Sequence, residues 1–286
     1  MKQITVGVDA SSESRAAVRW AGAEATRRQQ PLHLVHLWLT HGRTAQAIPH
    51  EEALLRAAQR LLQEAEADVR ARFPGVRVTS ELVTADSPDA LVTTGGDPAH
   101  NDLLVLGSQG LGAVPGYLLG SVGLHTVAHA GCPVALVRGA EDPARLGDGP
   151  GPVAIGVSTR PGHEPVLEFA FSTAARYGTP LLAVHAASRH PALIGRDELE
   201  HHAAADHDAE QFHETLRPWR DRFPAVHVVE HLSHGSPARA VLDVAPGAGL
   251  LVVGRGHHAA LGPRIGPVAH AAIHHALCPV VTVPHG

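Results

Sequence analysis

Apolar residues in the first half of the chain follow two different periodicities. Short, nearly continuous apolar runs lie at 4–8, 32–37, 76–83, 103–106 and 134–138. The stretches between these runs carry apolar residues at every third or fourth position, which is the spacing of one buried helix face. Apolar strands that alternate with amphipathic helices are typical of a parallel sheet covered on both faces.

Four helices are predicted between these strands. Ser11 or Ser12 can cap the first helix, and the pair at 87–88, Ser-Pro, opens the third. The second helix carries the apolar positions of 54–69, and the fourth spans 121–130. Right-handed crossovers then give an α/β fold with a doubly wound, five-stranded parallel sheet, flavodoxin- or Rossmann-like. Ligands of such sheets bind at the carboxyl ends of the strands, where the winding direction reverses.

The second half of the chain repeats the first in the same order and with nearly constant spacing. The matching segments are 6–9 with 155–158, 34–36 with 183–185, 72–74 with 222–224, 87–88 with 236–237, 105–107 with 252–254, and 132–134 with 278–280. Such ordered self-similarity indicates two tandem copies of one domain. We predict domains at 1–138 and 152–286, joined by a linker at 139–151 that is rich in Gly, Pro and Asp.

Composition and charge narrow the classes of partner. The chain has 286 residues, of which 44% are hydrophobic and 18% charged, so it can bury a core in each of two domains. The net charge of −5 argues against nucleic acid and against an anionic membrane surface as partners. The N-terminus enters a strand without a signal-peptide pattern, and Cys132 and Cys278 suit buried thiols in a reducing compartment. We therefore expect a cytoplasmic protein with no membrane partner.

The candidate site collects residues that follow the predicted strands at one edge of the first sheet. A carboxylate at Asp9 suits ribose hydroxyls or a base edge, and the backbone near Val35 suits an adenine edge. A glycine loop leading into a helix start brings backbone N–H groups close to phosphates. The predicted site residues are Gly7, Asp9, Ala10, Ser11, Val35, Gly107, Ser108, Gly110, Gly120 and Ser121.

Each of these residues also has an ordinary structural role. Asp9 alone is a helix cap or turn residue, Val35 a core strand residue, Ser121 a cap, and the glycines turn residues. Their combination at one sheet edge favours a nucleotide site. Gly-Lys-Ser/Thr, a dinucleotide fingerprint after the first strand, and Gly-x-Ser-x-Gly are all absent from the sequence. No residue is predicted to be catalytic or to bind a metal, although His270 and His274 lie four residues apart on a predicted helix.

These features resemble the universal stress protein family in its tandem, two-domain form. The motif Gly-x2-Gly-x9-Gly-Ser begins at Gly107 and ends at Ser121, and the segments 6–9, 34–36 and 132–134 support the resemblance. Family members that keep this motif bind ATP, so the resemblance implies ATP, alone or with Mg²⁺. Asp9 and Val35 would then hold the nucleoside, and the motif residues with Val122 would hold ribose and phosphates. The resemblance also implies that the protein is a binding or regulatory module of the stress response.

The resemblance has a further implication for assembly. Members of the family commonly pair through their last strands, which lie at the edge of the sheet. The segments 134–137 and 280–283 are therefore expected to pair within one chain as an internal pseudo-dimer, and a homodimer is a further expectation.

The second copy departs from the motif. Asp9 becomes Ser158, the glycine loop becomes 254–257, Gly-Arg-Gly-His, and the next helix opens with Gly266-Pro267. Proline has no N–H to offer a phosphate, although Arg255 or Arg264 could add charge. We expect the first copy to bind ATP and the second to bind weakly or not at all. The sequence leaves two alternatives open, a slow ATPase or nucleotide-dependent transferase, and an interaction scaffold without nucleotide.

Overall fold

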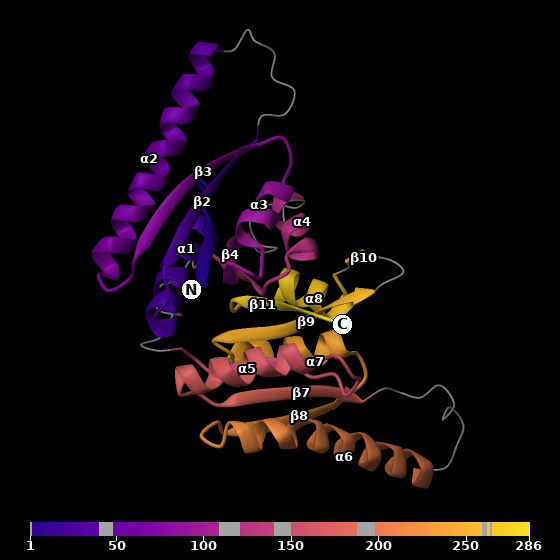
Figure 1. Cartoon of the computed structure of the whole chain (residues 1–286). Coiled ribbons are helices and arrows are strands. Elements are labelled where there is room, and N and C mark those ends of the chain that lie inside the picture. Colours follow the sequence, from indigo (N-terminus) through magenta and orange to yellow (C-terminus); the bar gives the residue numbers. More distant parts are fainter. Residues whose placement is uncertain are drawn as a thin grey trace. The chain divides into compact units, whose positions relative to one another are not determined.

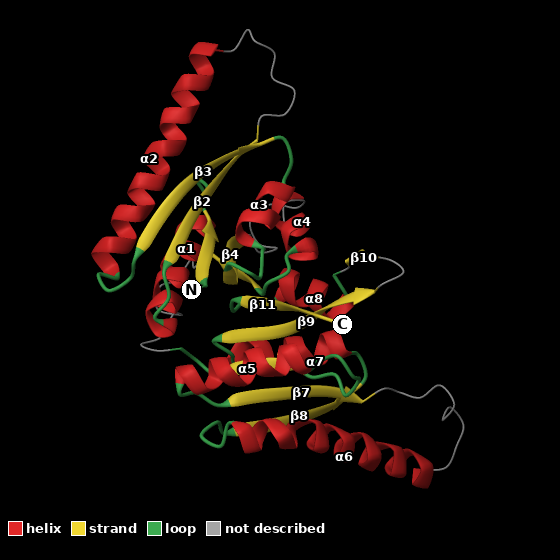
Figure 2. Ribbon diagram, viewed as in Figure 1, coloured by secondary structure: helices red, strands yellow, loops and turns green. Residues whose placement is uncertain are grey.

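A computed structural model describes residues 2–39, 48–108, 121–139, 150–187, 198–258, 262–263 and 265–286 of the chain. The chain divides into two compact units, Met1–Pro143 and Ala144–Gly286 (Figure 1). Each unit is an α/β domain that contributes its own strands and helices (Figure 2).

The first unit contains a five-stranded parallel sheet in the order β3-β2-β1-β4-β5. Every paired strand in it is parallel to its neighbour. This order confirms the predicted doubly wound fold. The elements are β1 (Gln3–Gly7), α1 (Ser12–Arg28), β2 (Leu32–Leu39), α2 (Ile48–Arg72), β3 (Val78–Ala85), α3 (Asp89–Gly95), β4 (Asn101–Ser108), α4 (Ser121–His129) and β5 (Val134–Arg138).

The second unit repeats this order as β8-β7-β6-β9-β11. A short strand, β10, pairs antiparallel with the end of β9, and the sequence pattern did not predict it. The elements are β6 (Val153–Gly156), α5 (Glu164–Tyr177), β7 (Leu181–Ala187), α6 (Glu198–Arg222), β8 (Val228–His234), α7 (Pro237–Val244), a 3₁₀ turn at Ala245–Gly247, β9 (Leu250–His258), β10 (Gly262–Pro263), α8 (Pro267–His275) and β11 (Val280–His285).

The winding of the first sheet reverses at β1, which pairs with β2 on one side and with β4 on the other. Helices α1 and α2 contact each other on one face, and α3 and α4 contact each other on the opposite face. The central strands are buried on both sides: Ile4, Val6, Leu103 and Val105 are fully buried on one face, and Thr5 and Leu104 are fully buried on the other. The carboxyl ends of β1 and β4 therefore lie side by side, and the chain leaves them toward opposite faces.

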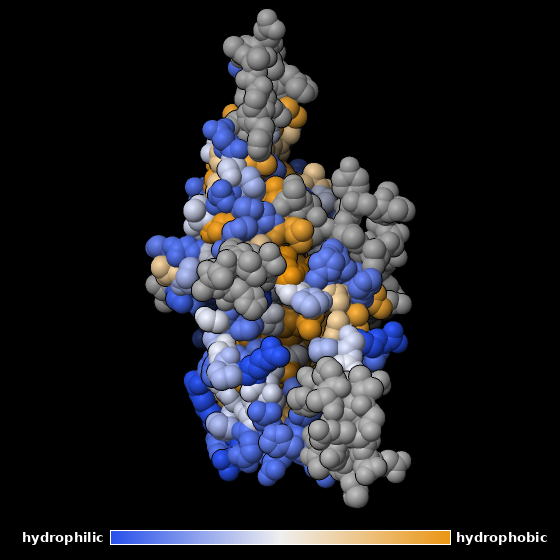
Figure 3. All heavy atoms as spheres, turned by 90° about the vertical axis from the view of Figure 1, so that its right-hand side faces the viewer, coloured by the Kyte–Doolittle hydropathy of each residue, from blue (hydrophilic) through white to orange (hydrophobic). Residues whose placement is uncertain are grey.

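Both cysteines are buried, and the surface carries polar residues together with apolar ones. Cys132 and Cys278 are buried thiols, as predicted. Figure 3 shows polar residues over the face turned to the viewer, with apolar residues in patches between them. In the described part of the chain, no helix is both long enough and apolar enough to cross a membrane.

The two copies end their first helix differently, which allows a matched test. Helix α1 ends at Gln29 with a φ of 53°, whereas α5 ends at Gly178 with a φ of 65°. A left-handed residue with a Cβ is strained, so Gln29→Gly should stabilise its unit by about 0.5–1 kcal/mol. Gly178→Gln should destabilise the other unit by about 1 kcal/mol. Urea denaturation of both variants checks this, and a loss of stability in Gln29→Gly would contradict it.

Candidate functional site

The candidate site lies at the carboxyl ends of β1 and β4, where α1 begins against the end of β4. A Cβ on Gly107 would lie 2.7 Å from the backbone carbon of Glu13 and 2.7 Å from the backbone nitrogen of Ser14. Gly7 is confined similarly, because its Cβ would lie 2.7 Å from the Leu106 side chain. Both glycines are thus explained by close packing between α1, β1 and β4.

Asp9 sits in the turn between β1 and α1. Its Oδ1 accepts hydrogen bonds from the Ser11 N–H at 2.9 Å and from the Ser11 hydroxyl at 2.5 Å. Ser11 Oγ in turn accepts the Ser14 N–H at 3.0 Å and caps α1. Asp9 therefore has the ordinary structural role of a turn residue before a helix. Its side chain is exposed, and among the described residues Oδ2 has no partner, so one carboxylate oxygen is available to a ligand.

Ala10 contributes only backbone to this turn. Its side chain is exposed, and its carbonyl accepts a hydrogen bond from Arg15 Nη1 at 3.1 Å. Together with Asp9 and Ser11 it forms the rim of the site next to β1.

Val35 is less available than its predicted role requires. Its side chain is 1% exposed, and its carbonyl accepts the Val8 N–H at 2.8 Å. The pairing of β1 with β2 ends at Val35. Successive residues of a strand direct their backbone groups to opposite sides, so Leu37 faces the same side as Val35 but beyond the end of β1.

Leu37 is therefore a candidate that the sequence analysis missed. Among the described residues, its N–H and C=O have no strand partner on the β1 side, because β2 extends to Leu39 while β1 ends at Gly7. The sequence pattern alone does not reveal this role, because it depends on where β1 ends beside β2 in the assembled sheet. A backbone donor and acceptor at this point suit the edge of a heterocyclic base.

The phosphate side of the site is described in part. Ser108 ends β4, and its hydroxyl is buried without a hydrogen-bond partner among the described residues. Gly110 and Gly120 lie outside the described residues. Ser121 is the first residue of α4, and Val122 follows it half-buried, with its carbonyl accepting the Thr126 hydroxyl at 2.7 Å.

The second unit builds this edge differently. Counted from the aligned pair Asp9 and Ser158, the residue that corresponds to Ser14 is His163. His163 Nε2 donates to the Gly156 carbonyl at 3.1 Å, and α5 begins only at Glu164. A Cβ on Gly254, the counterpart of Gly107, would lie 2.6 Å from His285 Nε2 and 3.1 Å from His163 Cε1. Two imidazoles thus occupy the space beside β9 that the first turn of α1 takes beside β4.

The helix after β9 also offers fewer donors. Helix α8 begins with Pro267, which has no N–H, and its N-cap is Gly266, which has no side chain. The backbone of β9 continues to His258, where β10 pairs with it. Where the second copy departs from the glycine motif, the end of β9 and the start of α8 therefore also differ from the end of β4 and the start of α4.

Histidine clusters do not build a metal centre in the described residues. The rings of His270 and His274 are 4.2 Å apart between centroids. No group of three or more His, Cys, Asp or Glu side chains suited to a metal occurs in the described ranges.

Comparison with known proteins identifies the family. A sequence model of the universal stress protein family matches residues 1–138 and 151–284. The chain belongs to the universal stress protein family. It is 32% identical over 291 residues to universal stress protein Rv2005c of Mycobacterium tuberculosis (strain ATCC 25618 / H37Rv), covering 97% of this chain and 95% of that protein. The match to both halves shows two universal stress protein domains in tandem.

Solved universal stress proteins share the fold. The crystal structure of one from Archaeoglobus fulgidus DSM 4304 has a TM-score of 0.74 at 15% identity and covers 99% of this chain and 98% of that chain. Two single-domain matches have a TM-score of 0.37. One, from Archaeoglobus fulgidus in complex with dAMP, is 24% identical and covers 48% of this chain and 98% of that chain. The other, in complex with cAMP, is 25% identical and covers 49% of this chain and 98% of that chain.

The packing at Gly107 predicts a stability effect. Gly107→Ala places a methyl group against the backbone of α1, which cannot move aside as a flexible side chain would. We expect a loss of about 1–3 kcal/mol in the free energy of unfolding of the first unit. Gly75→Ala is the control, because a Cβ there meets nothing within 4 Å. Equal stabilities of the two variants in urea denaturation would contradict this account.

The buried His163 predicts acid sensitivity of the second unit. Burial lowers the pKa of His163 from 6.5 to about 4, although the bond to Gly156 opposes this shift. The unfolded chain therefore binds a proton at a higher pH than the folded chain, and stability falls as the pH drops from about 6.5 to about 4, by about 3 kcal/mol.

The variant His163→Ser, which restores the residue of the first copy, should flatten this part of the pH profile. Denaturation curves at several pH values measure the effect. The same slope in both proteins would show that His163 is not its source.

Proposed function

We propose that the first unit binds ATP, alone or with Mg²⁺, at the carboxyl ends of β2, β1 and β4. The observation that carries the proposal is the set of polar groups at these three adjacent strand ends that have no partner in the described part of the chain. They are the backbone of Leu37, the Oδ2 atom of Asp9 and the buried hydroxyl of Ser108. A buried hydroxyl without a partner costs free energy, which a bound ligand recovers.

The nucleoside half of ATP fits the β2 and β1 side of this set. The Asp9 carboxylate accepts strong hydrogen bonds from ribose hydroxyls, and Ser11 holds it in place through Oδ1. Leu37 offers a donor and an acceptor to the adenine edge, beside the predicted Val35. Members of this family bind adenine nucleotides, dAMP and cAMP among them.

The phosphate half fits the segment from Gly107 to Ser121. Gly107, Gly110, Gly120 and Ser121 keep the spacing of the family motif, and the segment leads into the N-terminus of α4. Backbone N–H groups and a helix N-terminus bind anions well. When bound, Mg²⁺ would be held through the phosphate oxygens.

The composition of this segment favours nucleotide binding rather than phosphoryl transfer. From 107 to 121 the chain has no Lys, Arg, His, Asp or Glu. Phosphoryl transfer needs positive charge over the transferred group and a residue that orients the nucleophile. We therefore propose a nucleotide-binding, regulatory module of the stress response, with no assigned catalytic residue.

The second unit is proposed to bind ATP weakly or not at all. Ser158 lacks the charge of Asp9, and Pro267 removes one N–H at the start of α8. Cytoplasmic location and the pairing of 134–137 with 280–283 stay predictions.

Calorimetric titration of the whole chain with ATP tests the proposal. We expect one tight site per chain, and Asp9→Ala should weaken it by about 10- to 150-fold, since a hydrogen bond to a charged group contributes about 1.5–3 kcal/mol. Ser158→Ala, at the matching position of the second unit, should leave the tight site unchanged. Two equally tight sites, or equal effects of the two variants, would contradict the proposal.

A further inference from the structure

One peptide group at the end of β1 is hydrogen-bonded by side chains from two other elements. It is the peptide between Val8 and Asp9. The Val8 carbonyl accepts a hydrogen bond from His36 Nδ1 of β2 at 2.6 Å, and the Asp9 N–H donates to the Ser14 hydroxyl of α1 at 2.9 Å. A carbonyl only accepts, so His36 Nδ1 carries the proton in this contact. The peptide is therefore held at both of its polar ends, and we call these two bonds the clamp.

The His36 half of the clamp lies where the ladder between β1 and β2 ends. The Val8 N–H donates to the Val35 carbonyl at 2.8 Å. In a parallel ladder the next bond would run from the Leu37 N–H to the Val8 carbonyl. His36 bonds that carbonyl instead, and no bond from Leu37 to Val8 occurs among the described residues. The Leu37 N–H thus stays available at the strand end.

The Ser14 half of the clamp fixes the backbone that leads directly into the Asp9 side chain. Ser14 is 2% exposed, and its N–H donates to Ser11 Oγ at 3.0 Å. A Cβ on Gly107 would lie 2.7 Å from this nitrogen, so β4 packs directly against Ser14. Ser11 in turn holds Oδ1 of Asp9. Because the backbone and Oδ1 are both held, the direction of Oδ2 is set before a ligand binds.

The second unit keeps only the first half of this arrangement. The Val157 carbonyl accepts a hydrogen bond from His185 Nδ1 at 2.9 Å. His163 stands at the position of the clamping serine, and it donates to the Gly156 carbonyl, one peptide earlier. In the described part of this unit, no side chain bonds the N–H of Ser158, the counterpart of Asp9.

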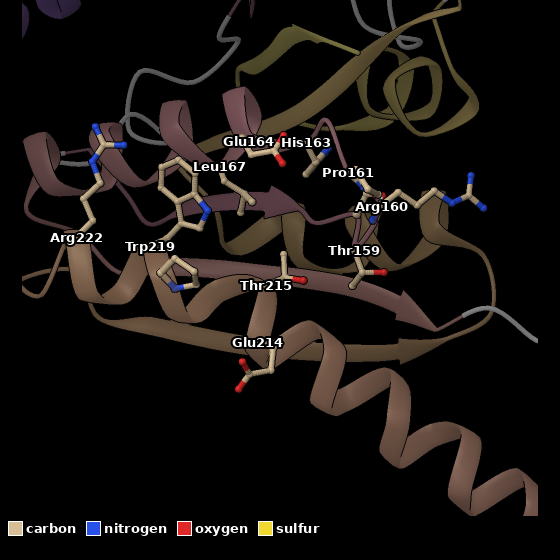
Figure 4. A pocket seen from close by; sticks show the side chains of 12 residues that line it. Thr159, Arg160, Pro161, His163, Glu164, Leu167, Glu214, Thr215, Trp219 and Arg222 are labelled. Carbon is tan, nitrogen blue, oxygen red and sulfur yellow. Dashed lines mark hydrogen bonds between the residues drawn. The ribbon is translucent and has the colours of Figure 1, made fainter.

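The loop before α5 differs in shape as well. Helix α1 begins at Ser12, whose counterpart is Pro161, but α5 begins three residues later, at Glu164. A cavity of about 490 Å³ lies beside this loop, and Thr159, Pro161 and His163 are among the residues that line it (Figure 4). The helical turn that carries the clamping serine is therefore replaced here, and the clamp belongs to the unit with the proposed nucleotide site.

We propose that His36 and Ser14 are positioning residues of the nucleotide site. Ser14 orients Asp9 toward the ribose hydroxyls, and His36 leaves the Leu37 N–H free for the base. This inference rests on the ATP site proposed for the first unit. Neither side chain needs to touch the nucleotide, because each acts through the shared peptide. Groups that are fixed in advance lose little freedom on binding, which raises the affinity.

Discrimination between sugars tests the Ser14 half of the clamp. Ser14→Ala removes the acceptor of the Asp9 N–H and adds no bulk. Calorimetric titration compares ATP with 2′,3′-dideoxy-ATP, which lacks the hydroxyls that Asp9 would bind. We expect Ser14→Ala to weaken ATP binding about 5- to 10-fold and dideoxy-ATP binding less than about twofold. In an Asp9→Ala background it should have no further effect. Ser12→Ala is the control, since the Ser12 hydroxyl bonds Glu13.

Two substitutions separate the hydrogen bond of His36 from its bulk. His36→Leu keeps an apolar side chain without a donor, whereas His36→Asn keeps an N–H donor near the place of Nδ1 on a smaller side chain. We expect His36→Leu to weaken ATP binding about 5- to 10-fold and His36→Asn to stay within about twofold of the unaltered chain. His185→Leu, which removes the matching bond of the second unit, should leave the tight site unchanged. Thermal melting shows that each variant folds.

These measurements separate the positioning role from the proposed function. If the unaltered chain binds no ATP, the proposed function fails and the positioning role fails with it. If Asp9→Ala weakens ATP binding, but Ser14→Ala weakens ATP no more than dideoxy-ATP, the role of Ser14 is wrong and the ATP site stands. If His36→Leu binds ATP as well as His36→Asn does, the role of His36 is wrong in the same way.

Discussion

The close packing of the first turn of α1 on Gly107 is the constraint on which the candidate site depends. The backbone of Glu13 and Ser14 occupies the space where a side chain of residue 107 would lie. This contact holds the turn after β1 next to the end of β4, at the point where the sheet reverses its winding. Asp9 and Ser108 are placed at adjacent strand ends as a consequence.

The second copy shows what happens when this contact is replaced. Its sheet has the same strand order, yet His163 and His285 lie beside Gly254 and α5 starts later. The core of a duplicated domain is thus preserved while the loops at its edge diverge, because buried strands tolerate little change in volume. The two copies therefore offer different surfaces at equivalent strand ends.

The strands were predictable because their apolar runs determine both their position and their burial. The bounds of β5 match the predicted 134–138, and β1 differs from the predicted 4–8 by one residue at each end. The role of Leu37 and the strand β10 were not predicted. Both depend on where a neighbouring strand ends, and that is a property of the assembled sheet rather than of local pattern. Gly110 and Gly120 carry the motif in sequence but lie outside the described residues.

A crystal structure of the whole chain grown with excess ATP tests the central claim most directly. We predict a nucleotide at the carboxyl ends of β1 and β4 of the first unit, with its ribose on Asp9, its base on the backbone of Leu37 and its phosphates along the segment from Gly107 to Ser121. A structure in which this place is empty or filled by the protein's own side chains, while the protein is saturated with ATP in solution, would contradict the account.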